Sequence, residues 1–432
     1  MSENSESSPL VIKNVRVFDG KSERLETGHV VVRGRRIDRI VPLMDEVAEP
    51  DDARVIDCAG EGGAVTRVLM PGLIDAHTHL AVSGISALEV LTGQDGLVHC
   101  KALAEARRVL MRGFTSVRDM GGPTGAIKSV IDSGEFPGPR VYPSNAAISQ
   151  TAGHGDFSAV YDAPTALGGP LSRAERLGIM RVADGPERVL AAVREQLKKG
   201  ACQVKLMAGG GVTSVYDDLD VLQFTPEELR VAVQAAQDWG TYVAVHVFDT
   251  EGIRRALDAG VRSIEHGQLA DEETVALVAS KGAWLSTQPF AVGDHSFPDP
   301  RSTAKDAEVC AGVDHLFTWA REHGARLAFG TDLLFAPDAG DRQSRMFTRL
   351  DRYMSPVDAL RVGTSGNAAL LGMAGNRDPY GEAELGVVRP GAWADLLVVE
   401  GDPTQDLSLL ADPGRNLSVI VKDGKVYRNR FG

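Results

Sequence analysis

From Gly113 onward, the chain repeats one pattern of apolar and polar positions: a helical stretch, a glycine, and a short apolar run that ends in a polar residue. Each repeat predicts a helix followed by a strand of a parallel sheet. The pattern is clearest at residues 225–239, where Thr225 and Glu228 form a capping box and Gly240 follows the end. Five repeats predict helices at 186–199, 225–239, 253–259, 271–281 and 306–323, with strands that end at Lys205, His246, His266, Gln288 and Asp332.

Three further apolar segments precede these repeats, at residues 73–79, 114–119 and 140–148. They raise the number of predicted parallel strands to eight. Eight parallel strands, each followed by a helix or a loop, predict an α/β fold of the (β/α)8 TIM-barrel type. An open, doubly wound parallel sheet is the alternative with the same local pattern.

Both ends of the chain alternate apolar and polar residues with a period of two, which is typical of antiparallel strands. One such region covers residues 9–68, and the other includes a hairpin signal at Asp423-Gly424. Because neither end has enough strands to close a core alone, we expect both to form one small β-sandwich. The predicted domains are a discontinuous sandwich of residues 1–69 and 376–432 and a barrel of residues 70–375.

Composition narrows the range of partners. The chain has 432 residues, of which 43% are apolar, and its formal net charge is -13. The acidic surplus contains no basic block, so neither nucleic acid nor an anionic membrane is an expected partner. The four cysteines lie far apart without Cys-x-x-Cys spacing, and the first residues carry no apolar signal segment. We therefore expect a reduced, cytoplasmic chain.

Candidate metal ligands stand at the C-terminal ends of different predicted strands. His77 and His79 are two residues apart, so both side chains point to one face of an extended strand. Each residue also has an ordinary structural interpretation, such as a core histidine or a helix cap. Their joint placement at the barrel rim, where catalytic side chains collect, favours a metal site. The other residues of this rim are Lys205, His246, His266 and Asp332.

Lys205 is unexpected among metal ligands, because a cationic amine repels a metal ion. Burial beside metals would lower the pKa of this amine. A neutral amine can take up carbon dioxide as a carbamate, which is an anionic oxygen ligand able to bridge two metals. The lysine that seems out of place is therefore diagnostic of a two-metal site.

These segments together resemble the amidohydrolase superfamily, over about residues 8–430. Within it, the segment SQTAGHGD (149–156) is most similar to the imidazolonepropionase-related branch, which includes Xaa-Pro dipeptidases (prolidases) and ochratoxin-hydrolysing amidohydrolases. The motifs that carry the resemblance are MPGLIDAHTHL (70–80), QVKLMAGGG (203–211), VAVHVF, SIEHG, FGTD and GVVRPGAWADLLVVEGDP (386–403).

The resemblance implies two divalent metal ions, with zinc as the first expectation and manganese or cobalt as alternatives. A hydroxide shared by the metals would attack the substrate carbonyl. Asp332 would take its proton and pass it to the leaving amine. The implied ligands are His77, His79 and Asp332 for one metal, His246 and His266 for the other, and N6-carboxylated Lys205 as the bridge.

Three further residues are expected to contact the substrate. His154 matches a substrate-contacting histidine of the family, with a catalytic role as neutral donor to the carbonyl or the carboxylate. Tyr216 follows a glycine-rich turn, and Gln288 ends the seventh strand. An ordinary structural role is the alternative for each of the three. Arg118 and Asp119, which close the second strand, are interpreted as a structural salt bridge below the rim.

The function that the resemblance implies is hydrolysis of an amide bond to a C-terminal amino acid. The substrate would be a Xaa-Pro dipeptide, an N-acyl amino acid or ochratoxin A. Ring opening of a cyclic amide such as an imidazolone, or of a lactone, is the alternative within the superfamily, and a scaffold without turnover is the alternative from another class. The branch also implies a homo-oligomer, often an octamer. Candidates for an apolar pocket wall are Phe290, Phe297, Leu334 and Phe335.

Overall fold

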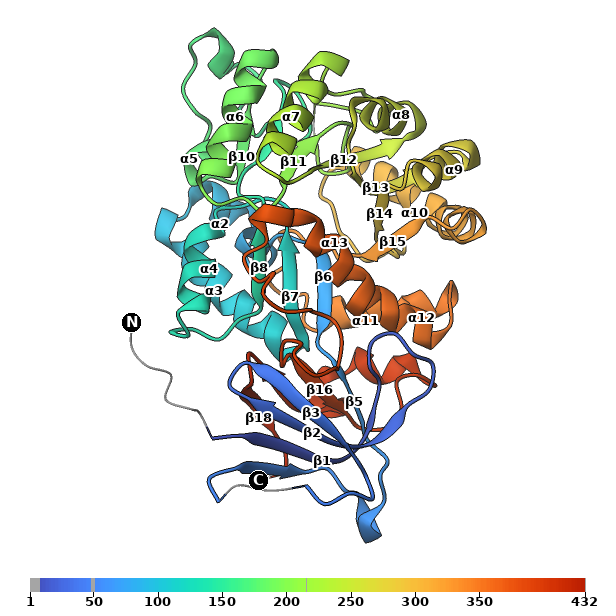
Figure 1. Cartoon of the computed structure of the whole chain (residues 1–432). Coiled ribbons are helices and arrows are strands. Elements are labelled where there is room, and N and C mark those ends of the chain that lie inside the picture. Colours follow the sequence, from blue (N-terminus) through green and yellow to red (C-terminus); the bar gives the residue numbers. More distant parts are fainter. Residues whose placement is uncertain (1–7, 48–50, 215, 432) are drawn as a thin grey trace.

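In the computed structural model, which describes residues 8–47, 51–214 and 216–431, parallel strands run through the large lobe and helices cover them (Figure 1). One ladder joins β6 (Leu73–Thr78), β7 (Phe114–Asp119) and β8 (Arg140–Pro143). A second ladder has the order β10-β9-β11-β12-β13-β14-β15. Its strands are β9 (Ala147–Ser149), β10 (Met180–Val182), β11 (Val204–Met207), β12 (Val243–Asp249), β13 (Ser263–Leu269), β14 (Trp284–Thr287) and β15 (Arg326–Phe329).

Backbone hydrogen bonds join the two ladders into a closed barrel. The amides of Thr331 and Asp332 donate to the carbonyl of His77 at 3.1 and 2.8 Å, so the segment after β15 pairs with β6. A Cβ at Gly330 would lie 2.3 Å from the Cβ of His77, and glycine therefore permits this close approach. The predicted barrel is confirmed, and the open sheet is excluded.

The third predicted strand, 140–148, is divided in two. Its first half, β8, pairs with β7, and its second half, β9, pairs with β10 and β11. Asn145 lies between the halves with a φ of 57°, in the left-handed region that strands do not adopt. The amide of Cys202 donates to the carbonyl of Pro143 at 2.7 Å and links β8 to the segment that enters β11. Sequence periodicity did not reveal this break.

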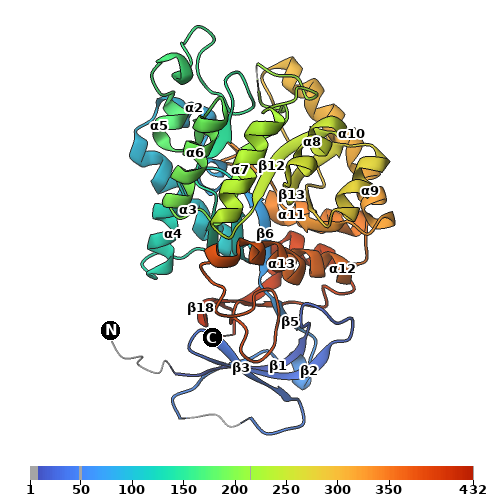
Figure 2. The same ribbon diagram turned by 45° about the horizontal axis from the view of Figure 1, so that its top comes forward.

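Helices follow the strands and surround the barrel (Figure 2). The predicted capping box is present, because the amide of Glu228 donates to the hydroxyl of Thr225 at 3.3 Å. Among the described residues, no helix combines the length and the apolar composition needed to cross a membrane. The helices are α1 (Leu80–Ser83), α2 (Ala87–Thr92), α3 (Asp95–Met111), α4 (Gly125–Asp132), α5 (Arg173–Leu177), α6 (Pro186–Lys198), α7 (Pro226–Asp238), α8 (Thr250–Ala259), α9 (Glu272–Ser280), α10 (Pro300–Glu322), α11 (Arg342–Thr348), α12 (Pro356–Arg361), α13 (Asn367–Leu371) and α14 (Pro413–Asn416).

The small lobe is one sheet built from both ends of the chain (Figure 1). Its order is β18-β17-β16-β5-β1-β2-β3, and β4 pairs with β1. Asp423 and Gly424 form the predicted hairpin turn with φ angles of 55° and 69°. The strands are β1 (Leu10–Val17), β2 (Glu26–Arg33), β3 (Arg36–Pro42), β4 (Arg54–Asp57), β5 (Val68–Pro71), β16 (Leu396–Val399), β17 (Leu417–Lys422) and β18 (Lys425–Asn429).

Side chains that alternate along the strands of this sheet pack into two different apolar cores. Val398 and Val419 belong to the core of the small lobe. Leu397 and Ile420, the residues beside them in sequence, belong to the cluster that also contains Phe114 at the start of β7. The sheet therefore closes the end of the barrel at which the strands begin and leaves the other end free for a site. The domain limits proposed from the sequence stay a prediction.

Candidate active site

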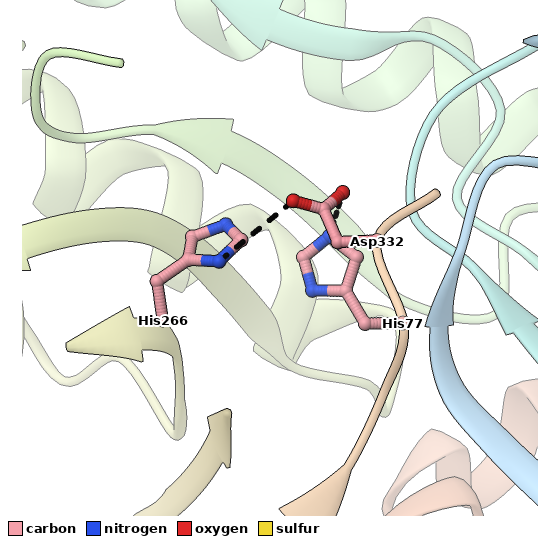
Figure 3. A group of neighbouring side chains, drawn as sticks. All are labelled: His77, His266 and Asp332. Carbon is pink, nitrogen blue, oxygen red and sulfur yellow. Dashed lines mark ion pairs between the residues drawn. The ribbon is translucent and has the colours of Figure 1, made fainter. Parts of the chain in front are cut away.

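Side chains from several barrel strands meet where those strands end. The ligand atoms of His77, His266 and Asp332 all lie within 4.8 Å of one another (Figure 3). The Nε2 atoms of His79 and His77 lie 3.1 and 3.4 Å from Oδ1 of Asp332. The ring centres of His246 and His266 are 4.5 Å apart. The four predicted histidines and Asp332 thus form one cluster.

Each histidine of this cluster contacts a protein oxygen through one ring nitrogen. These four contacts are His77 Nδ1 to Glu265 Oε2 (2.8 Å), His79 Nδ1 to the Gly121 carbonyl (3.1 Å), His246 Nε2 to the Gly210 carbonyl (3.0 Å) and His266 Nδ1 to Gln288 Oε1 (2.8 Å). A neutral imidazole that donates one N–H in this way keeps a lone pair on its other nitrogen. Contacts of this kind fix ring orientation in metal sites and leave one donor atom per ring.

At His79, burial is outweighed by Asp332 and Asp119, whose negative charges raise the pKa. At the other three histidines, burial favours the neutral form that metals require. It lowers the pKa of His77 to about 3 and that of His266 to about 4, and it holds the pKa of His246 well below its usual value. Burial alone would raise the pKa of Asp332, but the histidines around it, led by His77, hold that pKa well below its usual value. Neutral imidazoles and a carboxylate suit divalent zinc, manganese or cobalt.

The backbone is unusual at two of the predicted ligands. His266 and Asp332 have φ angles of 77° and 50°, and Gly267 continues at 79°. Neighbouring residues of a strand normally point to opposite faces, yet Glu265 and His266 both reach the cluster. The left-handed backbone at His266 breaks the alternation, at a typical cost of about 1–3 kcal/mol.

Lys205 comes from the middle of β11 and is 1% exposed. Burial lowers the pKa of its amine to about 8, against the attraction of Glu265 and Asp332, which favours the charged form. Across residues 8–47, 51–214 and 216–431, no carboxylate oxygen lies within 4.0 Å of this amine, so the amine forms no ion pair there. The amine is therefore no ordinary salt-bridge partner, and its carboxylation stays a prediction.

The three predicted substrate contacts differ in their surroundings. The ring of His154 stacks on that of His246 at 4.3 Å, and its Nδ1 is buried without a hydrogen-bond partner in the described part of the chain. Gln288 contacts His266, whereas the hydroxyl of Tyr216 donates to the carbonyl of Ser158 at 2.6 Å. Of these three residues, only His154 lines the cavity of about 740 Å³ that lies over the cluster. Their substrate roles stay predictions.

Glu265 is a functional residue that the sequence interpretation missed. It is fully buried and accepts from His77 and, at 2.8 Å, from Nη2 of Arg118. The expected salt bridge between Arg118 and Asp119 is wrong, because neighbours in a strand point to opposite faces. Asp119 accepts instead from the amide of Leu80 at 2.8 Å. The alternation of side chains along a strand was the signal that would have placed Arg118 and Asp119 on opposite faces.

A cavity of about 740 Å³ opens over the cluster. Its lining includes His154, His246 and Asp332, so the cluster forms part of its wall. Much of the remaining lining is apolar, as is typical of small-molecule sites. All four residues predicted for an apolar wall line it, namely Phe290, Phe297, Leu334 and Phe335.

Comparison with known proteins agrees with this geometry. The model of the amidohydrolase family matches residues 68–427. Ochratoxinase of Aspergillus niger is 33% identical over 377 residues, which are 84% of this chain and 76% of that protein. The structure of a prolidase complexed with N-methylphosphonate-L-proline is similar with a TM-score of 0.87 and 34% identity, over 98% of this chain and 100% of that one. A Xaa-Pro dipeptidase with methionine in its active site has a TM-score of 0.82 and 30% identity, over 98% and 100% of the two chains.

Proposed function

This chain belongs to the amidohydrolase family and hydrolyses amide or peptide bonds, and on that premise we propose that it is a two-metal enzyme that releases a C-terminal amino acid. The proposed substrates are Xaa-Pro dipeptides, N-acyl amino acids and ochratoxin A, which is an amide of phenylalanine. The names of the similar prolidase and ochratoxinase support this substrate class. One observation carries the proposal: neutral histidines and Asp332 converge on the wall of a cavity large enough for a small amide.

The donors fit two divalent ions, with zinc as the first candidate and manganese or cobalt as alternatives. Contacts to Asp332 support grouping it with His77 of β6 and His79 just after that strand, and the adjacent rings of β12 and β13 support a second group. When bound, the metals would activate a water and polarise the scissile carbonyl. The proposed ligands are His77, His79 and Asp332 for one metal, His246 and His266 for the other, and carboxylated Lys205 between them.

The chain's own groups have distinct tasks in this proposal. Asp332 is ionised at neutral pH because its pKa is held low, so it can accept a proton from water and pass it to the leaving nitrogen. His154 is neutral, since burial lowers its pKa to about 3, and its ring lines the cavity, where a neutral imidazole can donate to the substrate carbonyl. Glu265 holds His77 in position and is held in turn by Arg118.

A substrate panel tests this function. The metal-loaded chain is incubated with N-acyl amino acids, Xaa-Pro dipeptides and ochratoxin A, and free amino acid is quantified by chromatography. We expect release from at least one class and none above background from a Lys205→Met variant run in parallel. No release from any member, together with turnover of an imidazolone or a lactone, would replace this proposal with ring opening.

We also propose that copies of this chain associate into a homo-oligomer, often an octamer in this branch. Large exposed apolar side chains support association, because Tyr161 is 97% exposed and Leu167 is 81% exposed. Leu88 of α2 is exposed as well. Light scattering after size-exclusion chromatography checks the mass, and a monomer at micromolar concentration would contradict the proposal.

A further inference from the structure

A buried lysine of α10 binds the loop after β11 (residues 208–214 and 216–225). Lys305 is 7% exposed, and its ammonium donates to the backbone carbonyls of Gly211 at 3.3 Å, of Ser214 at 3.2 Å and of Asp217. An ammonium has three N–H donors and no acceptor, so these three carbonyls satisfy it. Within the described ranges, Lys305 forms no ion pair with a carboxylate. The loop therefore folds around a charge that a distant helix supplies.

The same loop contacts His154 at its backbone and at its ring. Oδ2 of Asp217 accepts from the amide of Gly211 at 2.9 Å and from Nε2 of Gln223 at 3.2 Å. Oε1 of Gln223 accepts in turn from the amide of His154 at 3.1 Å. A Cβ at Gly211 would lie 2.0 Å from Nδ1 of His154, so glycine permits the loop to approach the ring this closely. The position of His154 therefore depends on the conformation of the loop.

The loop also contacts the second group of proposed metal ligands and the cavity. The carbonyl of Gly210 lies 3.0 Å from Nε2 of His246, and the ring of His154 stacks on that of His246. Val212 and Thr213, which lie between two of the carbonyls that accept from the ammonium, line the cavity. A shift of the loop would therefore move a histidine ring of the cluster together with part of the cavity wall.

Close packing of α10 fixes the lysine relative to the cluster. Gly312 lies about two turns after Lys305, on the same face of the helix. A Cβ at Gly312 would lie 1.8 Å from the carbonyl oxygen of Gln268, so the helix packs directly against the end of β13. The same strand carries His266, the other histidine of the second group. The ammonium thus holds the loop at a set position relative to a strand of the cluster.

We propose that Lys305 is a positioning residue of the active site, whose ammonium keeps the loop after β11 in the conformation that orients His246 and His154. This role rests on the proposed function and deepens it, because those two histidines are assigned there to a metal and to the substrate carbonyl. The role is indirect, since the ammonium contacts the loop carbonyls and the loop contacts the two histidines.

A double-mutant cycle between Lys305 and His154 tests this role. Lys305→Met keeps the length of the side chain but none of its donors, whereas Lys305→Gln keeps two. We expect Lys305→Met to lower kcat/KM on the best substrate of the panel about 10- to 100-fold, as when groups that orient metal ligands are removed, and Lys305→Gln to lower it less. In a His154→Asn background, the loss caused by Lys305→Met should be at least about threefold smaller, because part of its effect passes through His154.

Zinc affinity, measured on the same variants by competition with a chelator, gives a readout that does not need turnover. We expect Lys305→Met to weaken the binding of one zinc ion about tenfold and to leave the other within about threefold, because the loop contacts His246 in only one of the two proposed ligand groups. Glu308→Gln is the matched control, since Glu308 lies one turn along the same helix and is exposed, and it should behave as the parent chain does.

Urea unfolding gives the folded fraction of each variant, and Lys305→Gln takes the place of Lys305→Met in both measurements if the latter does not fold. Additive losses in the cycle together with unchanged zinc affinity would overturn the role of Lys305 while leaving the proposed function in place. If the parent chain hydrolyses no amide, the proposed function fails, and zinc affinity alone decides the role of Lys305. A tenfold weaker second ion would then support it, and equal affinities in the parent chain and the variant would refute it.

Discussion

The two ends of the barrel treat buried charge differently. Where the barrel meets the small lobe, Arg140 is fully buried, donates to Asp395 at 2.9 and 3.3 Å, contacts Asp423, and lies 3.9 Å from the ring centre of Trp393. At the opposite rim, Lys205 is as deeply buried yet has no ion pair in the described ranges. Each member of a buried ion pair is required for stability, because removing one of them leaves the other buried without a counter-charge. A buried charge without a partner marks a functional site.

The backbone differs between the two ends as well. At the small lobe, the left-handed φ of Asp423 belongs to a hairpin turn, which accommodates it. At the rim, left-handed φ angles occur at His266, inside β13, and at Asp332, just after β15. Strain of this kind persists only where surrounding contacts stabilise it. The comparison predicts that substitutions at the rim change activity and those at the other end change stability.

Replacing Lys205 by methionine should give the largest effect. We expect kcat/KM for amide hydrolysis to fall at least about a thousandfold, or about 4 kcal/mol of transition-state stabilisation. The melting temperature of the metal-free chain should stay the same or rise, because no ion-pair partner is left behind. Amino-acid release and thermal unfolding measure the two quantities, and Lys281→Met, at an exposed lysine, is the control. An active Lys205→Met variant would contradict the conclusion that the unpaired buried amine at the rim serves activity.

Arg140→Met should show the reverse pattern. Asp395 and Asp423 would keep buried negative charge without their main counter-ion, so we expect a loss of about 3–5 kcal/mol in the free energy of unfolding. The kcat of the folded fraction should not change. Urea unfolding followed by circular dichroism checks the first expectation. A variant with unchanged stability would show that this end does not depend on paired charge.

Glu265→Gln sharpens the comparison, because Glu265 is a paired charge at the rim. The substitution weakens the hold on His77, and we expect metal affinity or activity to fall about 10- to 100-fold. It also removes the counter-charge of buried Arg118, so stability should fall too. Metal affinity and urea unfolding are measured on the same preparation. A change in one quantity alone would show that the two roles of Glu265 are separable.

Acid should affect the small-lobe end through Asp423. Burial raises the pKa of this group, but Arg140, Arg35 and Lys422 together outweigh burial and lower the pKa to about 2. A lowered pKa contributes stability that is present above the unfolded-state value, about 4, and is lost as pH falls towards 2. Between about pH 5 and pH 3, this group should contribute a loss of about 1 kcal/mol that Asp423→Asn lacks. Parallel pH dependences of unfolding in the two proteins would contradict this assignment.

The local pattern of apolar and polar residues predicted the barrel and its rim, because neighbouring residues indicate where a strand ends and where a glycine ends a helix. The strands that carry His246 and His266 were predicted for that reason, but their predicted ends were too early, since β12 continues to Asp249 and β13 to Leu269. Long-range partners were not predictable, since nothing beside Glu265 in the sequence indicates that it contacts His77 and Arg118. Single-residue backbone changes were missed as well, as at Asn145, which divides a strand that looks continuous in the sequence.

Metal titration against activity tests the central proposal most directly. The chain is stripped with a chelator, zinc is added stepwise in bicarbonate buffer, and amino-acid release is followed at each step. We predict that the rate rises to a plateau at two metal ions per chain and that Lys205→Met does not reach it. Full amide hydrolysis by the stripped chain, or a plateau at one ion per chain that Lys205→Met shares, would contradict a two-metal site built around Lys205.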